Sequence, residues 1–173
     1  MNVILIGMPA SGKSTVGVIL AKILGMDFVD TDLLLQKKYG KKLSAMIEEN
    51  GLDAFVGAEG RLCAGLEAEN TVIATGGSVV YSEDAMAHFQ QIGVVLYLEV
   101  GRETLKKRLK DVQERGVVIR EGQTLDELFD ERTRLCRRYA GITVSEEGLS
   151  LEETVQAAAR KLKDSGAFEG KKL

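Results

Sequence analysis

The clearest chemical signal in this chain lies in a glycine-rich segment near its start. Residues 7–14, GMPASGKS, match the pattern GxxxxGK[ST] at every fixed position. Glycines at these positions let the backbone wrap around a phosphate group, and N–H groups at the start of the following helix direct partial positive charge at it. We expect Lys13 to neutralise β- and γ-phosphate oxygens and the hydroxyl of Ser14 to ligate Mg²⁺. The segment therefore predicts a site for a nucleoside triphosphate.

Two carboxylates stand two residues apart after the second expected strand, at Asp30 and Asp32. Ligands of open parallel sheets bind at the carboxyl ends of the strands, and we expect this strand to lie one strand over from the phosphate loop. One carboxylate would hold Mg²⁺ through water, and the other would accept a proton from an attacking hydroxyl. The alternative interpretation is that Asp30 or Asp32 only caps the following helix.

Arginines are concentrated in one part of the chain, where eight of the ten lie between Arg102 and Arg138. Arg115 opens a glycine-containing loop after a predicted helix, and such a loop could close on a triphosphate and stabilise the charge that develops during transfer. Arg120 is a second candidate for this role. Arg134, Arg137 and Arg138 are typical of a solvated helix face.

Strand-like and helix-like segments alternate along the chain. Short apolar runs rich in β-branched residues predict strands over 3–6, 28–29, 71–74, 93–100 and 142–144. Apolar residues at helical spacing predict helices over 14–24, 33–39, 43–49, 52–69, 83–91, 102–114, 125–140 and 151–162. This alternation produces βαβ units and a parallel sheet covered by helices on both faces. We expect a single α/β domain over 1–163 and a flexible C-terminal tail over 164–173.

Composition argues against several other classes of protein. The 173 residues carry a formal net charge of −3, whereas a general nucleic-acid binder carries a basic excess. No apolar run approaches the roughly 20 residues that span a bilayer, and the short run at 3–6 does not predict a signal peptide. The two cysteines form no CxxC pair and are typical of a reducing compartment. We therefore expect a cytoplasmic protein with no nucleic-acid or membrane partner. The sequence carries no signal for the oligomeric state, for which our expectation is a monomer.

With these motifs in place, the chain from Met1 to about Leu162 resembles the shikimate kinase family. The motifs that occur in the family's order and spacing are the phosphate loop, DTD at 30–32, TGGS at 75–78, Arg115 and Glu131-Arg132. The resemblance implies a three-layer αβα P-loop kinase with a five-stranded parallel sheet, substrate-binding helices over about 33–68 and a mobile lid over about 112–124. It also implies transfer of the ATP γ-phosphate to the 3-hydroxyl of shikimate, a step of aromatic amino acid biosynthesis, with Mg²⁺ as cofactor.

The same resemblance implies roles for individual residues. The implied ATP-binding residues are Pro9, Ala10, Ser11, Gly12, Lys13, Ser14, Thr15, Arg108 and Arg115, of which Arg108 matches a residue that stacks on adenine in the family. The implied substrate-binding residues are Asp32, Phe55, Glu59, Gly76, Gly77, Ser78 and Arg132. Ser14 and Asp30 would hold Mg²⁺. Lys13, Asp32 and Arg115 would carry the catalysis.

The chain departs from the family pattern on the acceptor side and in the lid. Val56 stands where the family has the arginine that pairs with the shikimate carboxylate. The absence of that arginine should weaken the binding of a carboxylate substrate roughly ten- to a hundredfold. Arg61 would point about 140° away from that position on a helix, so Arg132 alone, or with Arg134, would hold the carboxylate. The other departures are Ser78 for the third glycine of GGG, Gly116 for the lid proline and Cys136 for a tyrosine.

Other functions stay open at this point. Val56 favours a related P-loop kinase for another small hydroxylated acceptor, one without a carboxylate. A nucleotide-binding regulatory module without transfer activity is a further alternative, although such a protein has no need of Asp32. A GTPase is disfavoured because the chain has no NKxD motif, and a nucleoside-monophosphate kinase because TGG at 75–77 and the DTD fit a small acceptor better.

Overall fold

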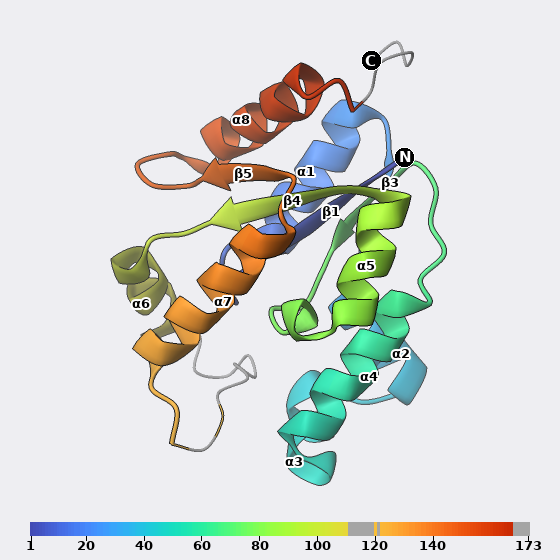
Figure 1. Ribbon diagram of the computed structural model, residues 1–173, viewed down its shortest axis with the longest axis vertical. Coiled ribbons are helices and arrows are strands. Elements are labelled where there is room, and N and C mark those ends of the chain that lie inside the picture. Colours follow the sequence, from blue (N-terminus) through green and yellow to red (C-terminus); the bar gives the residue numbers. More distant parts are fainter. Residues whose placement is uncertain (111–119, 121, 168–173) are drawn as a thin grey trace.

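Five parallel strands form the centre of the structure, a computed structural model that describes residues 1–110, 120 and 122–167. The strands are β1 (Asn2–Gly7), β2 (Asp27–Asp30), β3 (Thr71–Ala74), β4 (Gly93–Glu99) and β5 (Ile142–Ser145). Their order across the sheet is β2-β3-β1-β4-β5 (Figure 1). Because every pairing is parallel, the carboxyl ends of the strands meet at one edge of the sheet.

Helices connect the strands and cover both faces of the sheet (Figure 1). They are α1 (Lys13–Leu24), α2 (Thr31–Tyr39), α3 (Leu43–Asn50), α4 (Leu52–Ala64), the 3₁₀ helix η1 (Val79–Tyr81), α5 (Glu83–Ile92), α6 (Arg102–Lys110), α7 (Leu125–Tyr139) and α8 (Leu151–Asp164). Val3 and Leu5 of β1 pack in the apolar cluster of α1 and α8. Ile4 and Ile6 pack on the opposite face, with α4, α5 and α7. The strand is buried on both faces, which confirms the predicted three-layer αβα architecture.

The strand order corrects the expected distance between the phosphate loop and the aspartate pair. β2 lies two strands from β1 rather than one, because β3 pairs with both of them. The chain leaves β2 through α2, α3 and α4 and then returns to the middle of this half of the sheet. Since α1 packs against β2 as well as β3, its first turn still reaches the end of β2.

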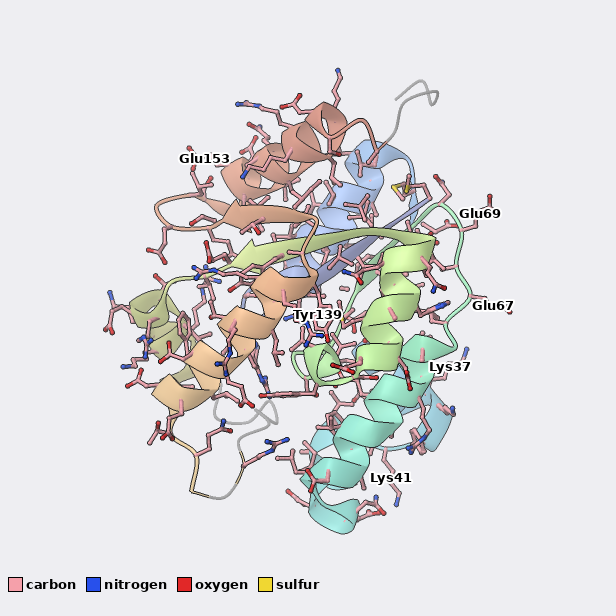
Figure 2. All side chains as sticks on the ribbon, viewed as in Figure 1. Lys37, Lys41, Glu67, Glu69, Tyr139 and Glu153 are labelled. Atoms are coloured by element: carbon pink, nitrogen blue, oxygen red, sulfur yellow. The ribbon has the colours of Figure 1, made fainter. Side chains whose placement is uncertain are left out.

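The helix predicted over 52–69 ends earlier, at Ala64. The side-chain amide of Asn2 donates to the carbonyl oxygen of Ala68 at 2.8 Å and holds the chain after α4 beside the start of β1. Figure 2 shows Glu67 and Glu69 of this segment pointing away from the core, where both are exposed. A tertiary contact therefore overrides the helical pattern of the last five residues.

Part of the predicted lid lies outside the described residues. The helix expected over 102–114 is described up to Lys110, and residues 120 and 122–124 represent the segment expected over 112–124. Arg115 and Gly116 lie outside the described residues, as do the last six residues of the expected tail. In the part of the chain that the structure covers, no helix is long and apolar enough to cross a membrane.

Candidate active site

The glycine-rich segment joins β1 to α1 at the carboxyl edge of the sheet, as predicted. Gly12 precedes α1 in the left-handed conformation, with φ 81°, and no side chain caps the helix. The N–H groups of the first turn therefore point to a space that an anion can fill. Ala10 is also left-handed, with φ 59°, a strained conformation for a residue with a Cβ. A loop of this shape provides a concave row of backbone donors.

Lys13, the first residue of α1, is buried against this loop. Its ammonium group donates to the carbonyl oxygens of Gly7 at 3.0 Å and Met8 at 2.8 Å, and it lies 3.4 Å from Oγ of Ser11. Burial lowers the pKa of Lys13, and the nearby Asp32 acts in the opposite direction. The loop itself thus positions the cation that the sequence predicts for phosphate oxygens.

Ser14 and Asp30, the two expected Mg²⁺ ligands, are in direct contact. The Ser14 hydroxyl donates to Oδ2 of Asp30 at 2.6 Å. The other oxygen of Asp30 accepts from the backbone N–H groups of Asp32 at 2.9 Å and Leu33 at 3.4 Å, so α2 begins at Thr31 rather than at 33. Asp30 therefore caps the helix, the alternative left open above, and still presents one oxygen beside Ser14.

The Ser14 hydroxyl and the Asp30 carboxylate fit a Mg²⁺ ion that is bound together with a nucleotide. A hydroxyl and a carboxylate are hard oxygen ligands, and Mg²⁺ commonly takes one or two of them and completes its shell with phosphate and water. The described residues contain no group of three or more His, Cys, Asp or Glu side chains that could hold a metal ion by themselves. The remaining ligands of a Mg²⁺ ion here would therefore be phosphate and water.

The predicted acceptor and phosphate residues surround one cavity of about 190 Å³. Its lining includes every predicted substrate-binding residue and, from the predicted ATP-binding set, Pro9, Ala10, Gly12, Lys13, Ser14 and Thr15. Ser11 and Arg108 line a neighbouring hollow instead. Arg115 lies outside the described residues.

Leu43, Thr75 and Leu109 also line the cavity, although sequence reasoning does not single them out. The two leucines have the apolar spacing of ordinary core positions. Thr75 could have been predicted from the sequence, because it is the first residue of the TGGS turn whose other three residues are predicted to bind substrate. Its hydroxyl donates to the carbonyl oxygen of Leu5 at 2.9 Å, which ties the end of β3 to β1.

Asp32 and Glu59 face each other across Gly76. A Cβ at Gly76 would collide with Oε1 of Glu59 and Oδ1 of Asp32, so a side chain there would displace these carboxylates. Burial raises the pKa of Asp32, Asp30 adds to this effect, and Lys13 opposes it. A carboxylate in this position can orient a hydroxyl in the cavity and accept its proton.

Glu59, on α4, is buried with an exposed fraction of 1%. The Ser78 hydroxyl donates a hydrogen bond to its Oε2. Its Oε1 has no hydrogen-bond partner among the described residues. Burial raises the pKa of Glu59 to about 7, although the bond from Ser78 lowers it. The hydroxyl that replaces a family glycine is thus engaged with Glu59.

Arg132, on α7, is the largest fully buried side chain of the described structure. Its Nε donates to the hydroxyl of Tyr81 at 3.3 Å, and its guanidinium lies 5.3 Å from the centre of the Tyr81 ring. Tyr81 donates in turn to Glu131 at 3.1 Å. A Cβ at Gly77 would lie 3.2 Å from Nη1 of Arg132, so the glycine lets the guanidinium pack closely against this turn. Sequence reasoning misses Tyr81, because a single aromatic residue in a short turn carries no spacing signal.

Val56 packs against the apolar cluster between α2, α3 and α4 and does not line the cavity. Arg61 and Arg134 are exposed and also lie outside the lining. Among the cationic side chains that the structure describes, Lys13 and Arg132 line the cavity. Of the two expected ways to hold a carboxylate, the geometry favours Arg132 alone.

Arg108, on α6, lies directly beside the phosphate loop. Its Nη1 donates to the carbonyl oxygen of Ala10 at 3.2 Å and to Oε2 of Glu146 at 2.8 Å. This position next to the loop is compatible with the adenine-stacking role that the resemblance implies.

A phosphate loop, a hydroxyl–carboxylate pair for Mg²⁺ and an acceptor cavity on one parallel sheet define a P-loop kinase of small molecules. Residues 9–163 match the family described as shikimate kinase, and the chain belongs to this family. It is 35% identical over 150 residues to the shikimate kinase of Persephonella marina, an overlap of 86% of this chain and 91% of that relative.

Solved structures agree with this assignment. Shikimate kinase from Acinetobacter baumannii in complex with shikimate has a TM-score of 0.86 at 27% identity, covering 95% of this chain and 93% of that one. Shikimate kinase from Aquifex aeolicus has a TM-score of 0.82 at 33% identity, covering 96% and 98%. The resemblance inferred from the motifs is therefore confirmed at the level of family and fold.

Proposed function

We propose that this chain transfers the γ-phosphate of ATP to the 3-hydroxyl of shikimate. The observation that carries the proposal is one shared cavity, because the phosphate loop, Asp32 and Arg132 all line it. A small molecule there can place a hydroxyl at Asp32 and a carboxylate at Arg132. Family membership supports the proposal, and the Acinetobacter baumannii relative was solved with shikimate bound.

The residues favour direct in-line transfer without a covalent enzyme intermediate. Asp32 accepts the proton of the attacking hydroxyl, whose oxygen bonds to the γ-phosphorus while the bond to the β-phosphate oxygen breaks. Lys13 neutralises the charge that moves onto the leaving ADP. Ser14 and Asp30 would hold Mg²⁺, which neutralises phosphate charge when bound. Arg115, outside the described residues, stays a predicted contributor of positive charge.

Arg132 is the proposed partner of the substrate carboxylate. It is a buried guanidinium on the cavity wall, and Tyr81 fixes its Nε end by a hydrogen bond. A guanidinium that is already oriented can form two parallel bonds to a carboxylate with little loss of side-chain freedom. One arginine can therefore do the work for which the family pattern uses two.

A second candidate is phosphorylation of another small hydroxylated acceptor, one without a carboxylate. Val56 is the observation that favours it, because the described lining holds no cation besides Lys13 and Arg132. The unpartnered Oε1 of Glu59 also suits an acceptor with several hydroxyl donors.

A coupled assay of ADP release over shikimate, quinate, gluconate and homoserine separates the two candidates. We expect shikimate to give the highest kcat/KM. Val56 does not line the cavity itself, but it precedes the cavity residue Glu59 by about one turn of α4, so we expect the longer side chain of Val56→Arg to reach the cavity. This variant is expected to lower KM for shikimate about tenfold or more, since it restores a charged hydrogen-bond donor. Ala54→Arg, which adds the same charge to an exposed position of α4, is the control and leaves KM unchanged. Turnover of another acceptor in preference to shikimate would contradict the first candidate, and an unchanged KM in Val56→Arg would contradict the account of the pocket.

We further propose that residues 1–163 act as one kinase domain, with acceptor-binding helices between about 33 and 68, in a cytoplasmic monomer. The phosphate loop, Asp32 and Arg132 all belong to the same chain, so the proposed site needs no residue from a second copy. Cys63 and Cys136 are buried and form no disulfide, which suits a reducing compartment. Size-exclusion chromatography with light scattering measures the mass and tests the monomer.

A further inference from the structure

A second hollow, of about 270 Å³, adjoins the phosphate loop. Ala10, Gly12 and Thr15 line both this hollow and the acceptor cavity, so the two spaces meet at the loop. Leu149, two residues before α8, and Leu151, the first residue of α8, also line the hollow and are 39% and 45% exposed. Two partly exposed leucines next to a phosphate site provide apolar surface for a flat ring.

Glu146 lines this hollow, and the proposed mechanism leaves it without a role. It is 7% exposed, and its Oε2 accepts from Nη1 of Arg108 at 2.8 Å. Its Oε1 is buried and has no hydrogen-bond partner among the residues that the structure describes. A buried carboxylate oxygen without a donor is unfavourable, so this atom is a ready acceptor for an N–H group of a ligand.

The backbone holds Glu146 in place. Its N–H donates to the carbonyl oxygen of Glu99 at 2.9 Å, and its own carbonyl accepts from the N–H of Leu149 at 3.0 Å. Burial raises the pKa of Glu146 and the ion pair with Arg108 opposes this, so another donor would stabilise the ionised form. The acceptor is therefore oriented before any ligand arrives, which lowers the entropy lost on binding.

Building on the proposed use of ATP, we propose that Glu146 determines base specificity by accepting, at Oε1, a hydrogen bond from the 6-amino group of adenine. The ring lies against Arg108 and the two leucines of the hollow. A purine without this amino group leaves Oε1 unpaired. Guanine carries a carbonyl oxygen at the same position, which would place a second acceptor against the carboxylate. A site built to hydrogen-bond one group of a ligand binds an analogue without that group much more weakly, because the buried group of the protein is then left unpaired.

The test compares ATP with purine riboside triphosphate, which differs from ATP only in lacking the 6-amino group. Calorimetry on the full chain, with Mg²⁺ and without acceptor, measures the two dissociation constants. We expect the unaltered protein to bind ATP about ten- to a hundredfold more tightly. Glu146→Ala is expected to bring this ratio close to one. Glu146→Gln, which keeps an acceptor but loses the charge, is expected to give an intermediate ratio and guards against a folding defect.

Glu152→Ala is the matched control, because it removes the same charge from an exposed position in the first turn of α8. Its ratio is expected to equal that of the unaltered protein. An unchanged ratio in Glu146→Ala, or tighter binding of GTP than of ATP by the unaltered protein, would overturn the assignment. The readout needs no acceptor. Selective ATP binding without shikimate turnover would therefore contradict the proposed function alone, and shikimate turnover with an unchanged ratio would contradict only the role of Glu146.

Discussion

The two sides of the central cavity are built in different ways. On the nucleotide side, Lys13 donates to two carbonyl oxygens no more than six residues away, within the loop that it serves. On the acceptor side, Glu59 is bonded by Ser78, 19 residues away, and Arg132 by Tyr81, 51 residues away. Phosphate recognition thus depends on local backbone geometry, whereas acceptor recognition depends on how distant helices pack.

This difference matches where the chain departs from its family. The phosphate loop keeps every fixed position of its motif, but Val56 and Ser78 replace family residues on the acceptor side. A side-chain contact on the acceptor side can be exchanged singly, because each is made by a separate group, such as the Tyr81 hydroxyl that accepts from Nε of Arg132. A backbone cradle leaves less freedom, because its shape depends on which residues tolerate left-handed conformations.

The largest expected effects come from replacing one central group on each side. Lys13→Ala and Asp32→Asn are each expected to lower kcat by about 10²- to 10⁴-fold, the first through lost charge neutralisation and the second through the lost proton acceptor. Calorimetry with ADP distinguishes them, since only Lys13→Ala should weaken nucleotide binding. Equal losses of ADP affinity would break the contrast between the two sides. Retained turnover in Asp32→Asn would remove this residue from the mechanism.

A smaller effect tests the long-range contact on the acceptor side. Tyr81→Phe removes the hydroxyl that bonds Arg132 and Glu131 but keeps the ring under the guanidinium. A net hydrogen bond is worth about 0.5–1.5 kcal/mol, so KM for shikimate should rise about two- to tenfold while KM for ATP and kcat stay constant. Tyr39→Phe, at an exposed tyrosine of α2, is the control. A rise in KM for ATP instead would place Tyr81 on the nucleotide side.

The smallest expected effect concerns stability rather than turnover. The pKa of Glu59 rises from 4.5 to about 7 on burial, so between these values the folded protein holds a proton that the unfolded chain has lost. Stability from this group is therefore complete below pH 4.5 and falls as the pH rises toward 7.

Glu59→Gln removes this ionisation, and its melting temperature should exceed that of the unaltered protein at pH 8 but not at pH 5. Each kcal/mol of difference in the free energy of unfolding should appear as a difference of about 2–4 °C in the melting temperature. Glu48→Gln, at an exposed position of α3, serves as the control. The same pH dependence in Glu59→Gln and the unaltered protein would contradict the assignment of the buried charge.

Much of the sheet could be predicted because each strand is a short apolar run with its own local signature. The run at 3–6 is buried on both faces, as a central parallel strand must be. The order of the strands across the sheet could not be predicted from such local signatures. Nothing in the residues of β1 and β2 indicates that β3 lies between them, and the end of α4 at Ala64 depends on a bond from Asn2 to Ala68.

The sequence by itself determined the phosphate loop, its lysine and the place of the aspartate pair at the end of β2, while it left open whether Asp30 or Asp32 caps the next helix. The hydrogen bonds of Lys13 to the loop and of Asp30 to the start of α2 join residues no more than six positions apart, so the order of these residues in the chain already sets their geometry. Only the tertiary structure decided which groups serve Glu59, Arg132 and Glu146. The hydrogen-bond partners of these three side chains lie on other helices or turns. Because buried polar groups need such partners, the packing of distant elements determines which groups they contact.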